Sequence, residues 1–274
     1  MDKLEYKQLL DAGVHFGHLT RKWNPKIAPY VFMERNGIHI IDLNKTLAEL
    51  DTAADAVKNI VRSGRKIMFV ATKKQAQEVV SEEAQRLRMP YVTDRWLGGM
   101  LTNFATIRKS LRKLSSIDKM MKEEEYKNLA KRERLMMSRE KEKLEKVLGG
   151  IADLTRLPSA LFVVDIKREH IAVKEAAKLN IPVIGMVDTN SDPTSIQFPI
   201  PANDDAFKSI SLIVKYIGQA VEEGLIERKQ QKEEAKLKEE EESKKQADEK
   251  EELEKGGEAQ KAETAETKES ASES

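Results

Sequence analysis

The 274-residue sequence contains no cysteine, so disulfides, thiolate nucleophiles and cysteine-ligated zinc or iron–sulfur clusters are all excluded. Aromatic residues make up only 5% of the chain. No run of about 20 apolar residues occurs, which excludes a membrane-spanning helix. The first residues lack the basic and apolar regions of a secretory signal. We therefore expect a cytoplasmic protein.

Two glycine-rich phosphate-binding motifs are also missing. Neither G-x-G-x-x-G, which binds dinucleotides, nor G-x-x-x-x-G-K-[ST], which binds nucleoside triphosphates, occurs in the sequence. Residues 72–75 and 165–168 follow two predicted strands, and they contain lysine or arginine but no glycine. We therefore expect the carboxyl ends of these strands to present cations that suit a phosphate backbone better than a buried cofactor.

The formal net charge of +1 averages segments of opposite sign. Residues 227–274 contain 17 acidic and 11 basic side chains, whereas residues 104–148 contain 14 basic and 8 acidic ones. Such a concentration of positive charge predicts a polyanionic partner for the middle segment.

Alternating helix and strand patterns predict an α/β domain over residues 1–226. Apolar residues recur every three or four positions over 43–61, which predicts a helix with Asn44 as its N-cap. Short apolar runs are typical of buried parallel strands. The predicted strands are 66–71, 160–165 and 181–187, and the other predicted helices are 75–88, 169–179 and 206–221. This alternation favours a doubly wound parallel sheet with helices on both faces.

Residues 104–148 interrupt the alternation, because they contain neither proline nor glycine and carry two narrow apolar stripes. This pattern predicts an antiparallel coiled-coil helical hairpin inserted in the α/β domain, with its reversal near Glu123. Residues 227–274 contain no aromatic residue and few aliphatic ones. We expect them to form a charged tail that extends the last helix and becomes disordered beyond Gly256.

Basic and aromatic residues lie together in two predicted loops. Residues 20–26 combine three cations with a tryptophan, and residues 95–104 place an arginine beside the second tryptophan. Cations attract phosphates and a tryptophan can stack on a base, although core packing is the simpler role of each tryptophan alone. Together with cations after the first predicted strand and at the start of the hairpin, the predicted RNA-binding residues are Arg21, Lys22, Trp23, Asn24, Lys26, Lys73, Lys74, Arg95, Trp96, Asn103, Arg108, Lys109, Arg112 and Lys113.

Metal binding has little support in the sequence. His15 and His18 are three residues apart, but no neighbouring pattern completes the three or four protein ligands of a zinc site. Asp188, Asp204 and Asp205 are weak candidates for a hydrated divalent ion, and turn capping is their simpler role. We expect no catalytic residue, and no cofactor other than such a structural ion.

Seven blocks of the sequence resemble, in order, the bacterial small-subunit ribosomal protein two family. They are 13–18, 23–26, 36–43, 72–76, 95–103, 169–176 and 199–206, so the resemblance covers essentially all of 1–226. It implies a flavodoxin-like sheet domain with a coiled-coil insertion, and a structural role in translation within cytoplasmic ribosomes. The implied partners are small-subunit ribosomal RNA and neighbouring ribosomal proteins, with ribosomal protein one as a protein that members help to recruit. Neither a membrane nor an independent homo-oligomer is expected.

Two other functions stay open from the residues alone. A Rossmann-type nucleotide or sugar-phosphate enzyme would use Lys73, Lys74 and the region from Asp188 to Asp205. A coiled-coil adaptor would present its positive hairpin to an acidic protein. The missing phosphate-binding glycines argue against the enzyme, and the two loops that combine cations with tryptophan favour RNA over an acidic protein.

Overall fold

The computed structural model describes residues 3–123, 126 and 130–234. The chain divides into two compact units, Met1–Leu225 and Ile226–Ser274. In the second unit, residues 226–234 are helical. The disorder expected beyond Gly256 lies outside the described residues.

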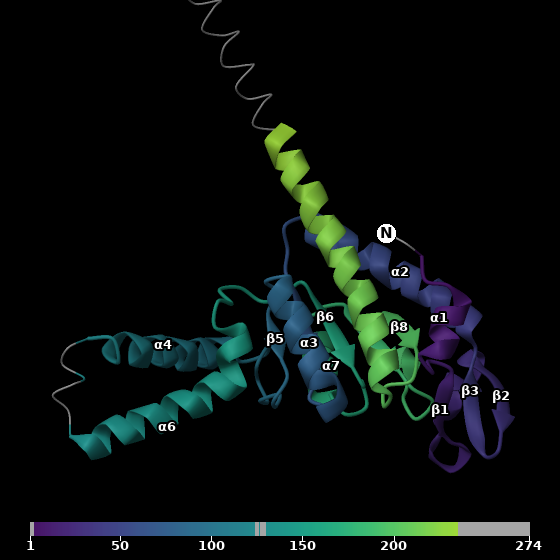
Figure 1. Ribbon diagram of the computed structural model, residues 1–274, viewed down its shortest axis with the longest axis horizontal. Helices are drawn as coiled ribbons and strands as arrows, with labels where there is room; N and C mark the ends of the chain where they lie inside the picture. The colour runs from purple at the N-terminus through teal and green to yellow at the C-terminus, as the bar shows by residue number, and fades with distance from the viewer. Residues whose placement is uncertain (1–2, 124–125, 127–129, 235–274) are drawn as a thin grey trace, which may run out of the picture. The chain divides into compact units, whose positions relative to one another are not determined.

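Five parallel strands form the main sheet of the first unit (Figure 1). Their spatial order is β5 (Tyr91–Val92), β4 (Ile67–Val70), β6 (Ala160–Val164), β7 (Val183–Val187) and β8 (Phe198–Pro201). The three predicted strands are confirmed as β4, β6 and β7. The edge strands β5 and β8 were not predicted, because β5 has two residues and β8 contains two prolines, which edge strands tolerate.

Helices cover both faces of the main sheet, as predicted. Side chains of successive strand residues point to opposite faces, so Ile67 and Phe69 belong to one hydrophobic core whereas Met68 and Val70 belong to another. The first core is covered by α2 (Leu43–Arg62), α3 (Lys74–Arg86) and helical residues 207–225, and the second by α7 (His170–Lys178). Asp42, rather than the predicted Asn44, caps α2, because its Oδ1 accepts a hydrogen bond from the backbone N–H of Asn44 at 3.0 Å.

A small antiparallel sheet precedes the main sheet along the chain. Its strands are β1 (Phe16–Leu19), β3 (Ile38–Ile41) and β2 (Val31–Arg35), preceded by α1 (Tyr6–Asp11) and interrupted by the short helices η1 (Thr20–Lys22) and η2 (Pro25–Tyr30). No strand was predicted here, because no side chain of β1 or β2 is buried and the two segments show no apolar alternation. Asn36 and Gly37, with φ of 53° and 71°, form the two-residue turn between β2 and β3.

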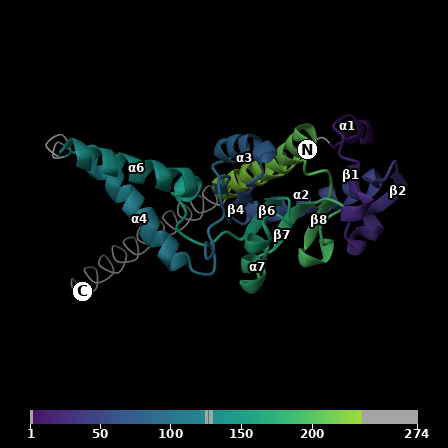
Figure 2. The same cartoon turned by 90° about the horizontal axis from the view of Figure 1, so that it is seen from below.

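The segment 104–148 contains the two predicted helices, α4 (Phe104–Met120) and α6 (Lys131–Leu148). They lie side by side in Figures 1 and 2, and ion pairs Lys113–Glu140 and Lys141–Asp118 join them. Ile107 and other apolar residues at their base belong to the second core. The chain then continues through η3 (Gly149–Ile151), while η4 (Pro193–Ser195) lies between β7 and β8. Among the described helices, none is long and apolar enough to cross a membrane.

Candidate nucleic-acid interface

The basic loop of residues 20–26 is fixed to the segment that follows β7. Thr189 accepts two backbone hydrogen bonds, through Oγ1 from the N–H of His18 and through its carbonyl from the N–H of Asn24, both at 2.8 Å. Gly17 permits this close approach, because a Cβ at this position would lie 2.5 Å from the methyl group of Thr189. The loop is therefore held at both ends against a strand end of the main sheet.

Three predicted residues of this loop are available to a partner. Arg21 and Lys22 are exposed, and neither forms an ion pair with another described residue. Trp23 is 38% exposed, and its ring centroid lies 4.8 Å from that of the buried His39. The histidine supports one face of the indole, so the loop presents two cations beside a positioned aromatic ring.

The other two predicted residues of the loop have partners within the protein. Lys26 forms an ion pair with Asp192 at 2.6 Å. The side chain of Asn24 accepts a hydrogen bond from the backbone N–H of Lys26 at 3.0 Å and so caps η2. These two residues therefore shape the loop.

Lys73 lies among carboxylates that follow other strands of the main sheet. Its Nζ is 2.6 Å from Asp205, 2.7 Å from Asp204 and 3.3 Å from Asp165. Burial by itself would lower the pKa of Lys73, but these carboxylates outweigh it and raise the pKa. The expectation that this edge presents free cations therefore needs correction at Lys73, whereas the adjacent Lys74 is exposed and has no ion pair among the described residues.

Asp204 is the most deeply buried of these carboxylates. Burial, together with the charges of Asp165 and Asp188, raises the pKa of Asp204 to about 7, although Lys73 opposes this shift. Its Oδ2 is buried and has no hydrogen-bond partner in the described part of the chain. The carboxyl edge of the sheet is thus an acidic site that one lysine partly neutralises.

His18, Asp188 and Asp205 form a cluster whose ligand atoms lie within 4.8 Å of one another, so together they could hold a metal ion. His18 Nδ1 is 2.9 Å from Asp188 and Nε2 is 3.4 Å from Asp205. The hydrogen bond to Asp188 raises the pKa of His18 despite partial burial, so a protonated imidazole can also satisfy both carboxylates.

The partners of His18 could not be predicted, because the carboxylates that surround it are distant in the sequence. Of the three weak metal candidates, the structure places Asp188 and Asp205 together with this imidazole. Asp205 faces His18 with Oδ2 and pairs with Lys73 through Oδ1, whereas Asp204 pairs with Lys73. Imidazole and carboxylate ligands suit zinc, and three protein ligands would leave a position for water.

The loop of residues 95–103 is organised by Glu175 of α7, a role that was not predicted from the sequence. Its carboxylate accepts hydrogen bonds from Trp96 Nε1 at 3.2 Å and from the backbone N–H groups of Gly99 at 2.7 Å, Leu101 at 3.0 Å and Thr102 at 3.1 Å. Burial alone would raise the pKa of Glu175, but these donors outweigh it and lower the pKa. Trp96 is only 6% exposed, so it packs in the core and offers no free stacking face.

Exposed cations flank the loop that Glu175 organises. Arg95 and the residues along one side of α4, which are Arg108, Lys109 and Arg112, form no ion pair within the described ranges. Lys113 is paired with Glu140 of α6. Asn103 accepts a hydrogen bond from Thr106 Oγ1 at 2.9 Å at the start of α4. This region therefore adds a row of available cations to those of the loop 20–26.

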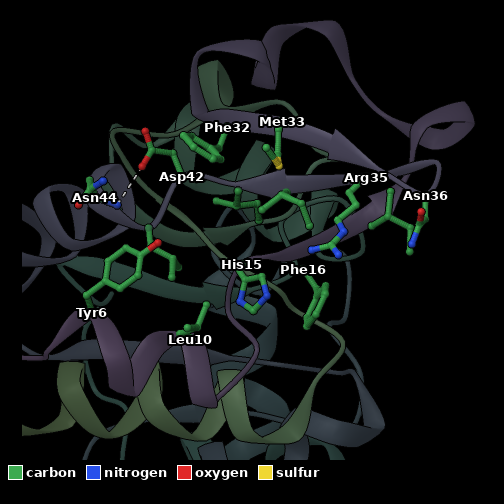
Figure 3. A pocket seen from close by; sticks show the side chains of 14 residues that line it. Tyr6, Leu10, His15, Phe16, Phe32, Met33, Arg35, Asn36, Asp42 and Asn44 are labelled. Carbon is green, nitrogen blue, oxygen red and sulfur yellow. Dashed lines mark hydrogen bonds between the residues drawn. The ribbon is translucent and has the colours of Figure 1, made fainter.

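A second candidate surface is an apolar hollow of about 560 Å³ between α1 and the small antiparallel sheet (Figure 3). Phe32 is 67% exposed, and Tyr6 and Phe16 are each 49% exposed. His15 also lines the hollow, and burial lowers its pKa, which favours the neutral imidazole. The hollow can accept an apolar or aromatic group, and no motif in the sequence had indicated it.

Comparisons with known proteins match nearly all of the described chain. The model of the family "Ribosomal protein S2" matches residues 9–224. Small ribosomal subunit protein uS2 of Cytophaga hutchinsonii is 73% identical over 235 residues, which cover 86% of this chain and 92% of the relative. The proteins of the same name from Flavobacterium johnsoniae and Parabacteroides distasonis are 62% and 61% identical, and the matches cover 85% and 86% of this chain and 91% and 85% of the relatives. The family match does not include residues 225–274.

Proposed function

The chain belongs to the ribosomal protein S2 family. We propose that it binds ribosomal RNA through exposed cations that are held on a rigid sheet domain. It is a structural protein of the small ribosomal subunit, acts in translation and catalyses no reaction. The observation that carries the proposed RNA contact is the loop 20–26, in which Arg21, Lys22 and Trp23 are exposed while Thr189 fixes the backbone at both ends.

We infer a flavodoxin-like domain over 1–226, a coiled-coil hairpin over 104–148 and a charged tail over 227–274. If the five strands are numbered from 1 to 5 along the chain, their spatial order across the main sheet is 2-1-3-4-5. This is the strand order of flavodoxin-like folds. The ion pairs between α4 and α6 and the buried Leu114 and Ile117 support packing of the two helices along a coiled-coil seam.

The predicted RNA-binding residues fall into two roles in this proposal. The exposed residues contact phosphates or bases, namely Trp23, whose ring rests on His39, and the cations that form no ion pair with a described residue, Arg21, Lys22, Lys74, Arg95, Arg108, Lys109 and Arg112. Those already paired or buried position the others, namely Asn24, Lys26, Lys73, Trp96, Asn103 and Lys113. Recognition depends on RNA shape and phosphate placement, because side chains cannot read the deep major groove of A-form RNA.

The double variant Arg21→Gln/Lys22→Gln tests the RNA contact. We expect it to be depleted from small subunits in sedimentation. For purified protein and deproteinised small-subunit RNA, the slope of log affinity against log salt should fall by about 0.7–0.9 for each lost phosphate contact. Lys208→Gln is the control, because it removes an exposed cation outside the loop. Full incorporation of the double variant, with an unchanged salt slope, would refute the contact.

We also propose that the apolar hollow receives a neighbouring ribosomal protein, and ribosomal protein one is the partner that the family resemblance names. Phe32 supports this, because an aromatic ring exposed to 67% gains most when a partner buries it. Phe32→Ala should remove ribosomal protein one from purified small subunits while this chain remains bound. Phe207→Ala is the control, since Phe207 is 52% exposed and does not line the hollow. Equal amounts of ribosomal protein one in both variants would exclude the hollow.

A further inference from the structure

The amino ends of the parallel strands lie at the edge of the main sheet opposite to the carboxylates around Lys73. Two hollows of about 550 and 340 Å³ lie there, lined by residues that precede β4, β5 and β6. They share Lys66, Asp153 and Leu154, so they form one continuous depression. We name it the amino-edge groove.

The groove is strongly basic. Arg88 and Lys66 line the larger hollow, and Arg65 and Arg156 line the smaller one beside Lys66. All four side chains are exposed, and none forms an ion pair with another described residue. Asp153 is the one carboxylate among the lining residues of the two hollows. Unlike Lys73 at the carboxyl edge, these four cations therefore keep their charge available.

Arg88 occupies a backbone conformation that favours glycine. It follows α3 with φ of 53°, where its N–H donates to the carbonyl of Gln85 and the N–H of Met89 donates to that of Ala84. Glycine is the usual residue at such a helix end, because a Cβ is disfavoured there. The turn does not require an arginine. The side chain of Arg88 therefore contributes a cation to the groove.

The groove also offers an aromatic ring and a hydroxyl group. Tyr91 is half-buried in its wall, and its oxygen accepts a hydrogen bond from Gln85 Nε2 at 2.6 Å. The phenolic hydrogen remains to be donated, and no acceptor for it lies among the described residues. Gly150 forms the adjacent wall, where a Cβ would lie 2.2 Å from the carbonyl oxygen of Tyr91. An aromatic face and a hydroxyl donor beside several cations suit an RNA strand better than an acidic peptide.

We propose that the amino-edge groove binds the phosphates of a second RNA segment, separate from the segment that the loop 20–26 contacts. This inference rests on the proposed RNA-binding function and adds a point of attachment at the opposite edge of the sheet from the loop 20–26. Two attachment points on one rigid sheet hold two RNA segments at a fixed separation, which a single basic loop cannot do.

Arg88→Gly removes the cation from the groove without disturbing the backbone at this position. Glycine adopts the positive φ readily, so the melting temperature should stay the same or rise. Affinity for deproteinised small-subunit RNA should fall, and the slope of log affinity against log salt should decrease by about 0.7–0.9. Asn180→Gly is the matched control, because Asn180 ends α7 with the same φ of 53° and carries no charge. A second variant, Lys66→Gln/Arg156→Gln, should lower the slope further while the fold is retained.

Unchanged affinity and slope in both groove variants would overturn the proposal. Normal RNA binding combined with loss from assembled subunits would also overturn it, because that outcome assigns the groove to an acidic protein. The Arg21→Gln/Lys22→Gln variant, measured in parallel, separates this failure from failure of the proposed function. If only the loop variant loses RNA affinity, the groove proposal alone fails; if the unchanged protein does not bind the RNA, the proposed function fails.

Discussion

At the carboxyl edge of the main sheet Lys73 lies among three carboxylates, whereas at the amino edge Arg65, Lys66 and Arg88 form no ion pair among the described residues. The sequence alone gives the opposite impression, because the lysine directly follows a strand and resembles a phosphate-binding residue. The carboxylates that neutralise it come from distant parts of the chain. Availability of a cation is therefore a property of the fold, and a count of basic residues does not predict it.

Lys73→Met should have the largest effect of the changes considered, because it leaves several carboxylates without their cation. We expect a loss of about 3–5 kcal/mol in the free energy of unfolding at about pH 8. Asp204 has a pKa raised to about 7, so it gains a proton in the folded state as the pH falls, and the loss should be smaller at about pH 5.5. Urea unfolding at both pH values measures this. Lys74→Met is the control, and equal losses at both pH values would contradict the explanation.

The main sheet could be predicted from the sequence, because its central strands are buried on both faces and appear as continuous apolar runs. The antiparallel sheet could not be predicted in the same way, since side chains of β1 and β2 are largely exposed. A local signal was nevertheless present. Asn36-Gly37 is the dipeptide most typical of a two-residue hairpin turn, and it lies between short apolar segments.

The candidate sites were less predictable than the fold. The loop 20–26 was visible because its cations and tryptophan are adjacent in the sequence. The partners of His18 and the role of Glu175 were not visible, because they depend on contacts between residues more than 70 positions apart. The amino-edge groove likewise draws its cations from three separate segments of the chain.

Glu175→Gln tests a carboxylate that is stabilised by N–H donors, in contrast to the carboxylates that are stabilised by the cation of Lys73. The amide group would place hydrogen-bond donors against the N–H groups of the loop, so we expect a loss of about 2–3 kcal/mol near neutral pH. The pKa of Glu175 is lowered in the folded state, so its stabilisation is present above the ordinary carboxyl pKa and is lost as the pH falls through the lowered value. The difference between variant and unchanged protein should therefore shrink in acid.

Guanidinium unfolding at neutral and acidic pH, followed by tryptophan fluorescence, measures this difference. Trp96 donates directly to Glu175 and so reports on the loop. Glu78→Gln is the control, because Glu78 is exposed on α3. A difference that stays constant with pH would show that the effect comes from packing rather than from the ionised carboxylate.

Gly17→Ala tests whether the contact with Thr189 keeps the loop 20–26 in place. The added Cβ would lie 2.5 Å from the Thr189 methyl group and 2.7 Å from its hydroxyl oxygen, so one of the two segments must move. We expect a loss of about 1–2 kcal/mol together with weaker RNA binding, because overpacking forces such shifts. Gly98→Ala is the control, since its Cβ would meet nothing within 4 Å. Unchanged RNA affinity in Gly17→Ala would mean that the loop does not need its anchor.

Lys26→Ala and Lys22→Ala should give the smallest changes in stability. Compared with each other, they test whether Lys26 positions the loop while Lys22 contacts RNA. Lys26 is paired with Asp192 but its side chain is 58% exposed, and such surface pairs contribute about 0–1 kcal/mol. Lys22 forms no ion pair with a described residue, although its charge helps to lower the pKa of Asp205, so its removal should change the free energy of unfolding only slightly while RNA affinity falls. Thermal melts and salt-dependent RNA binding measure both quantities. If Lys26→Ala lowered RNA affinity more than Lys22→Ala, the ion pair between Lys26 and Asp192 would have to open when RNA binds. An ion pair in the free protein would then not distinguish positioning residues from contact residues.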